Sequence, residues 1–131
     1  MKKNGFTLIE LLAVIAVLAI ILLIAVPQVL TIISSSKQQA AVKSAMFAWE
    51  AAEAYIGSQS MGGTVPTANV TYAQFNTLMQ GGASSSVTAG TFTNTNGTIT
   101  GIAANVVVSS GGTTYNCIAT SPTTKSAITC S

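Results

Sequence analysis

An apolar run near the amino terminus most constrains how this chain can fold. From Phe6 to Ile33 nearly every residue is apolar, and residues 11–26 contain only Leu, Ile, Val and Ala. At a rise of about 1.5 Å per residue, a helix of this length spans a hydrocarbon layer about 30 Å thick. We therefore expect a transmembrane helix over residues 6–36, which leaves residues 37–131 to form a globular part.

One carboxylate, Glu10, lies inside this run. A charge within a bilayer is costly, so it is interpreted as functional by default. A secretory signal peptide would suit the preceding lysines and the apolar run, but no A-x-A cleavage site follows. A plain membrane anchor leaves Glu10 unexplained, and the lysines on both sides of the run give no clear orientation.

A third hypothesis gives Glu10 a partner. No Lys or Arg lies within the run. Cleavage after Gly5 would create an α-amine on Phe6, one helical turn before Glu10. That amine would neutralise Glu10 in its own chain or in a neighbouring copy, and pairing with a neighbour would fix the axial register of the two copies. Glu10 and Phe6 are therefore predicted to form a charge pair for assembly.

The hexapeptide GFTLIE at residues 5–10 follows a short leader with two lysines and precedes the apolar run with its Pro27. In these features the chain resembles the prepilin motif of type IV pilins, secretion pseudopilins and competence pilins. The resemblance implies that residues 1–5 are a leader, which a prepilin peptidase removes between Gly5 and Phe6 before it N-methylates Phe6. It also implies that Glu10 pairs with the Phe6 amine of an adjacent subunit.

The resemblance further implies where the chain resides and what it meets. It would cross the lipid bilayer of the cytoplasmic membrane once, and then enter an extracellular filament made of its own copies. Its partners would be the prepilin peptidase and the pilus assembly machinery in the inner membrane.

Pro27 is expected to kink the helix or loosen one turn, because its ring nitrogen cannot donate to the Leu23 carbonyl.

Residues 37–57 are rich in alanine and are predicted to form an amphipathic helix that ends at Gly57. Residues at helical spacing are expected to share one face that packs on a sheet: Val42, Ala45, Trp49, Ala52 and Ile56. Phe47, Ala51 and Tyr55 form a second apolar side. A helix that is apolar on two sides usually has two neighbours, so one neighbour would be its own domain and the other another subunit.

The rest of the chain is predicted to be a loop with a short helix over residues 58–86 and an antiparallel sheet of three or four strands over residues 87–131. Thr71 and Gln74 have the spacing of a capping box, and Gly81-Gly82 would end the short helix. Asn96-Gly97 is a strong hairpin signal. The expected fold class is α+β, with the long helix packed on one face of the sheet.

Two cysteines, Cys117 and Cys130, lie near the carboxyl terminus. In an exported chain we expect them to form a disulfide, and two buried free thiols are the alternative. Asn69 and Asn96 each begin an N-x-T glycan acceptor pattern, but a surface without sugar fits the composition equally well.

The residue inventory excludes several classes of function. The chain contains no His, Asp or Arg, on which catalytic and metal sites depend heavily, so we expect no catalytic residue, no metal site and no cofactor. Without the leader, the chain contains three lysines and three glutamates, so its side-chain charges sum to zero. We therefore expect no nucleic-acid partner.

The resemblance leaves a choice among members of its class. A major structural pilin is favoured, because a cysteine pair and an uncharged outer domain suit a filament exposed to the outside. A major pseudopilin of a type II secretion system is the alternative, but that class typically binds Ca²⁺ with acidic loop residues, and no Asp or Glu follows Glu53. A DNA-uptake pilin would need exposed basic residues, and Lys125 is the only one after Lys43.

Overall fold

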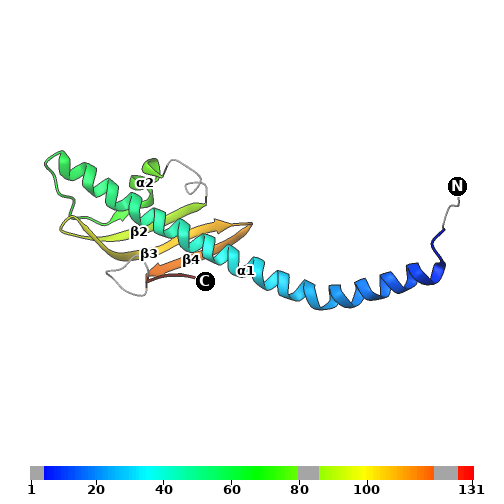
Figure 1. Ribbon diagram of the computed structural model, residues 1–131. Helices are drawn as coiled ribbons and strands as arrows, with labels where there is room; N and C mark the ends of the chain where they lie inside the picture. Colours follow the sequence, from blue (N-terminus) through cyan, green and yellow to red (C-terminus); the bar gives the residue numbers. More distant parts are fainter. Residues whose placement is uncertain (1–4, 80–85, 120–126) are drawn as a thin grey trace. The chain divides into compact units, whose positions relative to one another are not determined.

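The computed structural model describes residues 5–79, 86–119 and 127–131. The chain divides into two compact units, Met1–Ser35 and Ser36–Ser131, and we call the second unit the head. One helix, α1 (Leu8–Met61), contributes residues to both units (Figure 1). The head adds a sheet and a short helix, so the fold is α+β as the sequence predicts.

The part of α1 in the first unit contains Pro27. The α-helix continues on both sides of this residue, so the proline does not end it. The Thr31 hydroxyl donates a hydrogen bond of 2.8 Å to the Pro27 carbonyl, one turn earlier in the helix. A kink at Pro27 stays a prediction.

The carboxyl end of α1 lies beyond the glycine at which the sequence predicts a stop. The helix passes through Gly57 and ends at Met61. The Gly62 and Gly63 N–H groups donate to the carbonyls of Gln59 and Ser60, and Gly63 has a left-handed φ of 85°. The expected end at Gly57 was wrong because a single glycine costs a helix only about 1 kcal/mol, whereas a left-handed glycine ends it.

The head contains a five-stranded antiparallel sheet in the order β1-β2-β3-β4-β5. Its strands are β1 (Val70–Thr71), β2 (Val87–Thr95), β3 (Thr98–Ser110), β4 (Thr113–Ala119) and β5 (Ile128–Cys130). The sequence predicts three or four strands, and β1 was missed because two residues are too few to show an alternating pattern.

A short helix follows β1, as predicted. It consists of α2 (Tyr72–Phe75) and a 3₁₀ turn, η1 (Asn76–Leu78). Gln74 Oε1 accepts hydrogen bonds from the backbone N–H and the hydroxyl of Thr71, at 2.8 and 3.0 Å. The predicted end of this helix at Gly81-Gly82 lies outside the described residues.

Two glycine-containing turns connect the long strands. Asn96 and Gly97 join β2 to β3 with φ values of 51° and 84°, the left-handed conformations that a tight hairpin requires. Thr95 pairs directly with Thr98 across this turn, so the predicted hairpin is present. Gly111 and Gly112 form the turn between β3 and β4.

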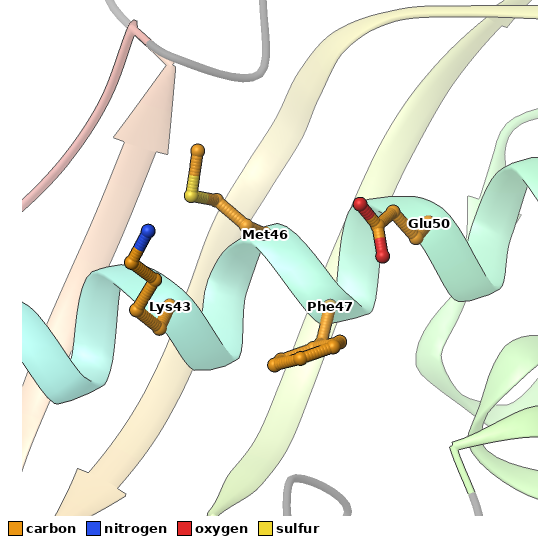
Figure 2. A pocket seen from close by; sticks show the side chains of 4 residues that line it. All are labelled: Lys43, Met46, Phe47 and Glu50. Atoms are coloured by element: carbon orange, nitrogen blue, oxygen red, sulfur yellow. The ribbon is translucent and has the colours of Figure 1, made fainter.

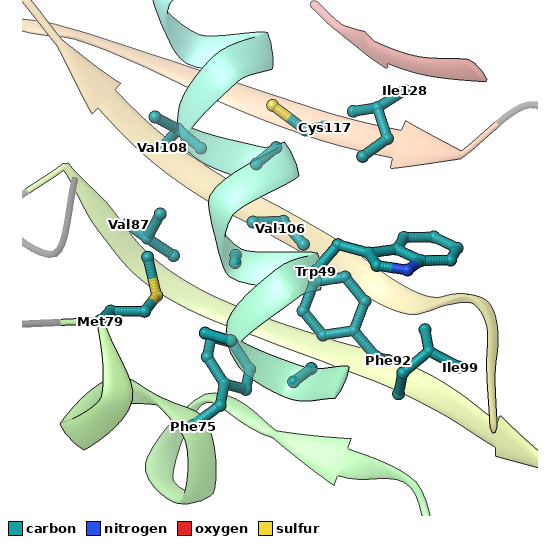
Figure 3. Packing of buried hydrophobic residues seen from close by; sticks show 14 of the residues in the cluster. Trp49, Phe75, Met79, Val87, Phe92, Ile99, Val106, Val108, Cys117 and Ile128 are labelled. Atoms are coloured by element: carbon teal, nitrogen blue, oxygen red, sulfur yellow. The ribbon is translucent and has the colours of Figure 1, made fainter. Parts of the chain in front are cut away.

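The core of the head lies between α1 and one face of the sheet (Figure 3). Of the residues predicted to face the sheet, Ala45, Trp49, Ala52 and Ile56 are buried, and Val42 is partly buried against the same cluster. The Trp49 and Phe92 rings meet edge to face with 5.7 Å between their centroids, and Phe75 contacts Phe92 in a similar way at 5.4 Å. These aromatic contacts join α1, α2 and β2 in one core.

Asn94 on β2 is a buried polar residue, at 6% exposure. Its side-chain amide donates to the carbonyls of Pro66 and Ala68, at 2.6 and 3.1 Å, and its Oδ1 accepts the Gly97 N–H at 3.0 Å. One side chain therefore holds the loop after α1 to the β2–β3 turn, two segments that have no strand pairing with each other at this point.

Cys117 and Cys130 form a disulfide between β4 and β5. They are directly opposed in the strand register, with 4.0 Å between their Cα atoms, and both are buried. The alternative of two free thiols is therefore wrong. The Gln38 side chain adds a second tie to β5 through a 2.6 Å hydrogen bond to the Cys130 carbonyl.

Replacing both cysteines by alanine should destabilise the head by about 3 kcal/mol, because the bridge closes a short loop of chain in the unfolded state. Urea unfolding of the detergent-solubilised chain, followed by Trp49 fluorescence, measures the loss. The urea midpoint of the double variant should not change when reductant is added. The midpoint of the parent chain should fall toward that of the double variant when its disulfide is reduced. Equal midpoints for the oxidised and reduced parent would contradict the stabilising role.

Asn94→Ala should destabilise the head by about 2 kcal/mol, because two carbonyls and one N–H lose a buried partner. Asn105→Ala is the matched control, since Asn105 is exposed on β3. The same urea experiment compares them. Similar midpoints for the two variants would show that the Asn94 hydrogen bonds do not hold the loop.

Candidate functional site

The candidate site is the segment that enters α1, residues 5–10. Thr7 immediately precedes the helix, and its carbonyl accepts hydrogen bonds from the N–H groups of Glu10 and Leu11, at 3.1 and 3.3 Å. In return, Glu10 Oε2 accepts the Thr7 N–H at 3.0 Å and the Thr7 hydroxyl at 2.7 Å. Glu10 thus satisfies a backbone N–H at the helix start, as the N3 glutamate of a capping box does.

Sequence reasoning missed this contact, although the T-x-x-E pattern at residues 7–10 was its signal. Both hydrogen bonds from Thr7 to the carboxylate end on Oε2. Within the part of the chain that the structure describes, Oε1 accepts no hydrogen bond from the protein. One half of the carboxylate is therefore held by its own chain, and the other half is available to a further donor.

Gly5 and Phe6 lie just before this cap and outside the helix. A Cβ atom at Gly5 would meet no other atom within 4 Å, so the fold gives no steric reason for glycine at this position. Phe6 is 86% exposed. The peptide bond between them is thus in a non-helical, accessible segment, which is the conformation that a peptidase can bind. The structure contains the uncleaved bond, so the predicted Phe6–Glu10 pair stays a prediction.

The helix behind this segment has an apolar surface on all sides. Every Leu, Ile and Val from Leu8 to Ile33 is exposed, and the least exposed of them, Ile33, is still 45% exposed. Among the described residues, α1 is the one helix long and apolar enough to cross a membrane. Apolar surface of this extent requires a cover of lipid or of other protein.

The described residues contain no group of three or more His, Cys, Asp and Glu that could hold a metal ion. The two cysteines are joined in the disulfide, so they supply no thiol. The site therefore consists of an accessible peptide bond, a capped carboxylate and an apolar helix. A peptidase can cleave the peptide bond, the carboxylate can pair with a cation, and the apolar helix can associate with lipid or with other protein.

Comparison with known families identifies the same region. Residues 1–26 match the family model described as the prokaryotic N-terminal methylation motif. This motif is the prepilin-type signature of type IV pilins and pseudopilins, which are structural proteins. Comparisons with curated proteins and with solved structures found no match.

Thr7→Val should loosen the first turn of α1, because the hydroxyl that holds Glu10 Oε2 is lost. Hydrogen exchange of the Glu10 and Leu11 amides, measured by NMR in detergent micelles, should become several-fold faster. Thr31→Val is the control, since it removes a hydroxyl from the same helix far from its start. Unchanged exchange in Thr7→Val would contradict the capping role.

Proposed function

We propose that this chain is a major structural subunit, a type IV pilin, that polymerises into an extracellular helical filament for adhesion, surface motility or related roles. The observation that carries the proposal is the methylation motif at residues 1–26. The exposed apolar surface of α1 and the disulfide-linked head support it.

The first step is processing at the membrane. With α1 across the bilayer, prepilin peptidase hydrolyses the peptide bond between Gly5 and Phe6 on the cytoplasmic side and releases the leader. A methyl donor then transfers a methyl group to the new α-amine of Phe6, which loses one proton as the N–C bond forms. A methylated amine still carries a proton, so it provides a cation at the start of an otherwise apolar segment.

The second step is assembly, in which the apolar helices exchange lipid for one another. Glu10 keeps its Oε2 contact with Thr7. Its Oε1 accepts a hydrogen bond from the protonated Phe6 amine of an adjacent copy. In a medium of low dielectric such a pair is favourable only at close range, so it permits one axial offset between neighbours. The assembly machinery in the inner membrane drives the extraction of the helix from the bilayer.

A type II secretion pseudopilin carries the same motif and is the alternative. The head supports the filament subunit, because no Asp or Glu follows Glu53 and a disulfide closes its last strands instead of a Ca²⁺ site. A DNA-uptake role is disfavoured, because Lys37 donates a 3.0 Å hydrogen bond to the Gly111 carbonyl and few other basic residues remain.

Electron microscopy of material sheared from the cell surface, with mass spectrometry of its main band, tests the proposal. We expect long filaments built of this chain, with a mature sequence that begins at N-methyl-Phe6 and one intact disulfide. A different first residue would contradict the processing step. Short periplasmic fibres that require a secretion system would favour the pseudopilin.

Two substitutions at one position separate charge pairing from helix capping. Glu10→Gln keeps an oxygen that can accept from Thr7 but removes the charge, and Glu10→Ala removes both. If charge pairing drives assembly, both variants should be made and processed, yet yield little filament. Filament at the parental level from Glu10→Gln would show that capping, and not charge, is the role of this residue.

A further inference from the structure

We propose that Asn96 is a deamidation site in the turn between β2 and β3, and that Asn94 protects it by holding the Gly97 N–H. The reaction needs water and no enzyme, so this inference does not depend on the proposed function. It assigns a chemical role to a hydrogen bond that otherwise only ties the turn to the loop after α1.

An asparagine followed by glycine is chemically labile. Once the Gly97 backbone nitrogen loses its proton, it can attack Cγ of the Asn96 side chain. The new N–C bond closes a five-membered succinimide, and the side-chain NH2 leaves as ammonia with a proton returned by solvent. Water then opens either carbonyl of the ring. The product is aspartate, or isoaspartate, in which the main chain runs through the former side chain.

The fold requires this labile pair. Asn96 and Gly97 have φ values of 51° and 84°, left-handed conformations that asparagine and glycine adopt most readily. A Cβ atom at Gly97 would lie 2.7 Å from Cγ1 of Val65, which is closer than Cβ contacts in proteins allow. Replacing the glycine would therefore force the loop after α1 to move. The turn thus keeps the residue type that shields its backbone nitrogen least.

The turn also places the reacting side chain in water. Asn96 is exposed, and Gly97 is only partly buried. Among the described residues Asn96 is the one asparagine followed by glycine, since Asn4, which precedes Gly5, lies outside them. Every other described asparagine is followed by a residue whose side chain shields the next nitrogen, namely Val70, Thr77, Thr95, Val106 or Cys117.

One hydrogen bond opposes the reaction at its first step. The Gly97 N–H donates to Oδ1 of Asn94 at 3.0 Å. An amide oxygen accepts this hydrogen bond but is too weak a base to take the proton. A nitrogen without its proton would face the lone pairs of Oδ1, which is unfavourable. The contact therefore disfavours both the loss of the proton and the rotation of the nitrogen toward Cγ of Asn96.

The orientation of Asn94 is fixed from its other side. Its Nδ2 donates to the carbonyls of Pro66 and Ala68, at 2.6 and 3.1 Å, and the residue is buried. A flipped amide would set its NH2 group against the Gly97 N–H and its oxygen against two carbonyls. Asn94 thus presents an acceptor, and not a donor, to the turn.

Deamidation would change both the charge and the geometry of the turn. Residues 54–124 contain no Lys, Arg, Asp or Glu, so either product would introduce the first charge of that stretch. Isoaspartate would also lengthen the main chain of a turn that pairs Thr95 with Thr98. Protection of Asn96 therefore preserves the hairpin on which β2 and β3 depend.

Hydrogen exchange of the Gly97 N–H measures the protection in the parent chain, because exchange begins with removal of the same proton. Gly112 is the matched reference, since it is exposed and is the second residue of the other two-residue turn, with a φ of 81°. In detergent micelles, NMR should show Gly97 exchanging several-fold more slowly than Gly112, after correction for neighbouring side chains. Equal exchange would overturn the proposal.

Incubation of the full chain in detergent at mildly alkaline pH tests the chemistry itself. Mass spectrometry of the chymotryptic peptide that follows Phe92 measures the conversion of Asn96, and a synthetic peptide of residues 91–101 gives the rate without the fold. The parent chain should react several-fold more slowly than the peptide. Asn94→Ala should react several-fold faster than the parent, the factor by which loss of one hydrogen bond shifts an equilibrium.

Two controls separate this hydrogen bond from general stability. Cys117→Ala/Cys130→Ala destabilises the head without touching the turn. Phe47→Ala changes a residue that is 54% exposed and lines a shallow pocket on α1 with Lys43, Met46 and Glu50 (Figure 2). Both controls should react at the parental rate.

Three results would overturn the proposal. They are a parent chain that reacts as fast as the peptide, an Asn94→Ala variant that reacts at the parental rate, and a cysteine variant that reacts as fast as Asn94→Ala. If Asn94→Ala does not fold, the exchange comparison between Gly97 and Gly112 in the parent chain decides.

Discussion

A single carboxylate in an apolar helix is the constraint on which the assembly account depends. Glu10 needs polar partners wherever the helix is surrounded by hydrocarbon. Its own chain provides one, because the Thr7 backbone and hydroxyl both donate to Oε2. This contact makes the carboxylate tolerable before assembly and orients it. In the proposed filament, the other oxygen binds the amine that processing creates, so the same residue would serve the helix start first and the polymer afterwards.

The core of the head consists of neutral side chains. It holds aromatic rings and small residues between α1 and the sheet, and the polar ties of the head are hydrogen bonds to backbone carbonyls, such as those of Asn94 and Gln38. The disulfide fixes the short last strand, which three residues could not hold alone.

Patterns that are local in sequence predicted much of this fold. Asn96-Gly97 predicted the hairpin, and the spacing of Thr71 and Gln74 predicted the start of the short helix. Two cysteines in an exported chain predicted one disulfide. The end of α1 was misplaced because Gly57 is helical whereas Gly63 has a left-handed φ, a difference that composition does not reveal. Lys37 and Gly111 are 74 residues apart, and such a contact leaves no local pattern. At the site, the T-x-x-E pattern at residues 7–10 was a local signal for the helix start, and an interpretation of Glu10 by its cost in a membrane alone does not use that signal.

The most direct measurement is an electron cryomicroscopy structure of the intact filament, at a resolution that shows side chains. The account predicts that the methylated Phe6 nitrogen of one copy lies within about 4 Å of the Glu10 carboxylate of another, the distance of an ion pair. Density that places these two groups far apart, each beside a different partner, would contradict it.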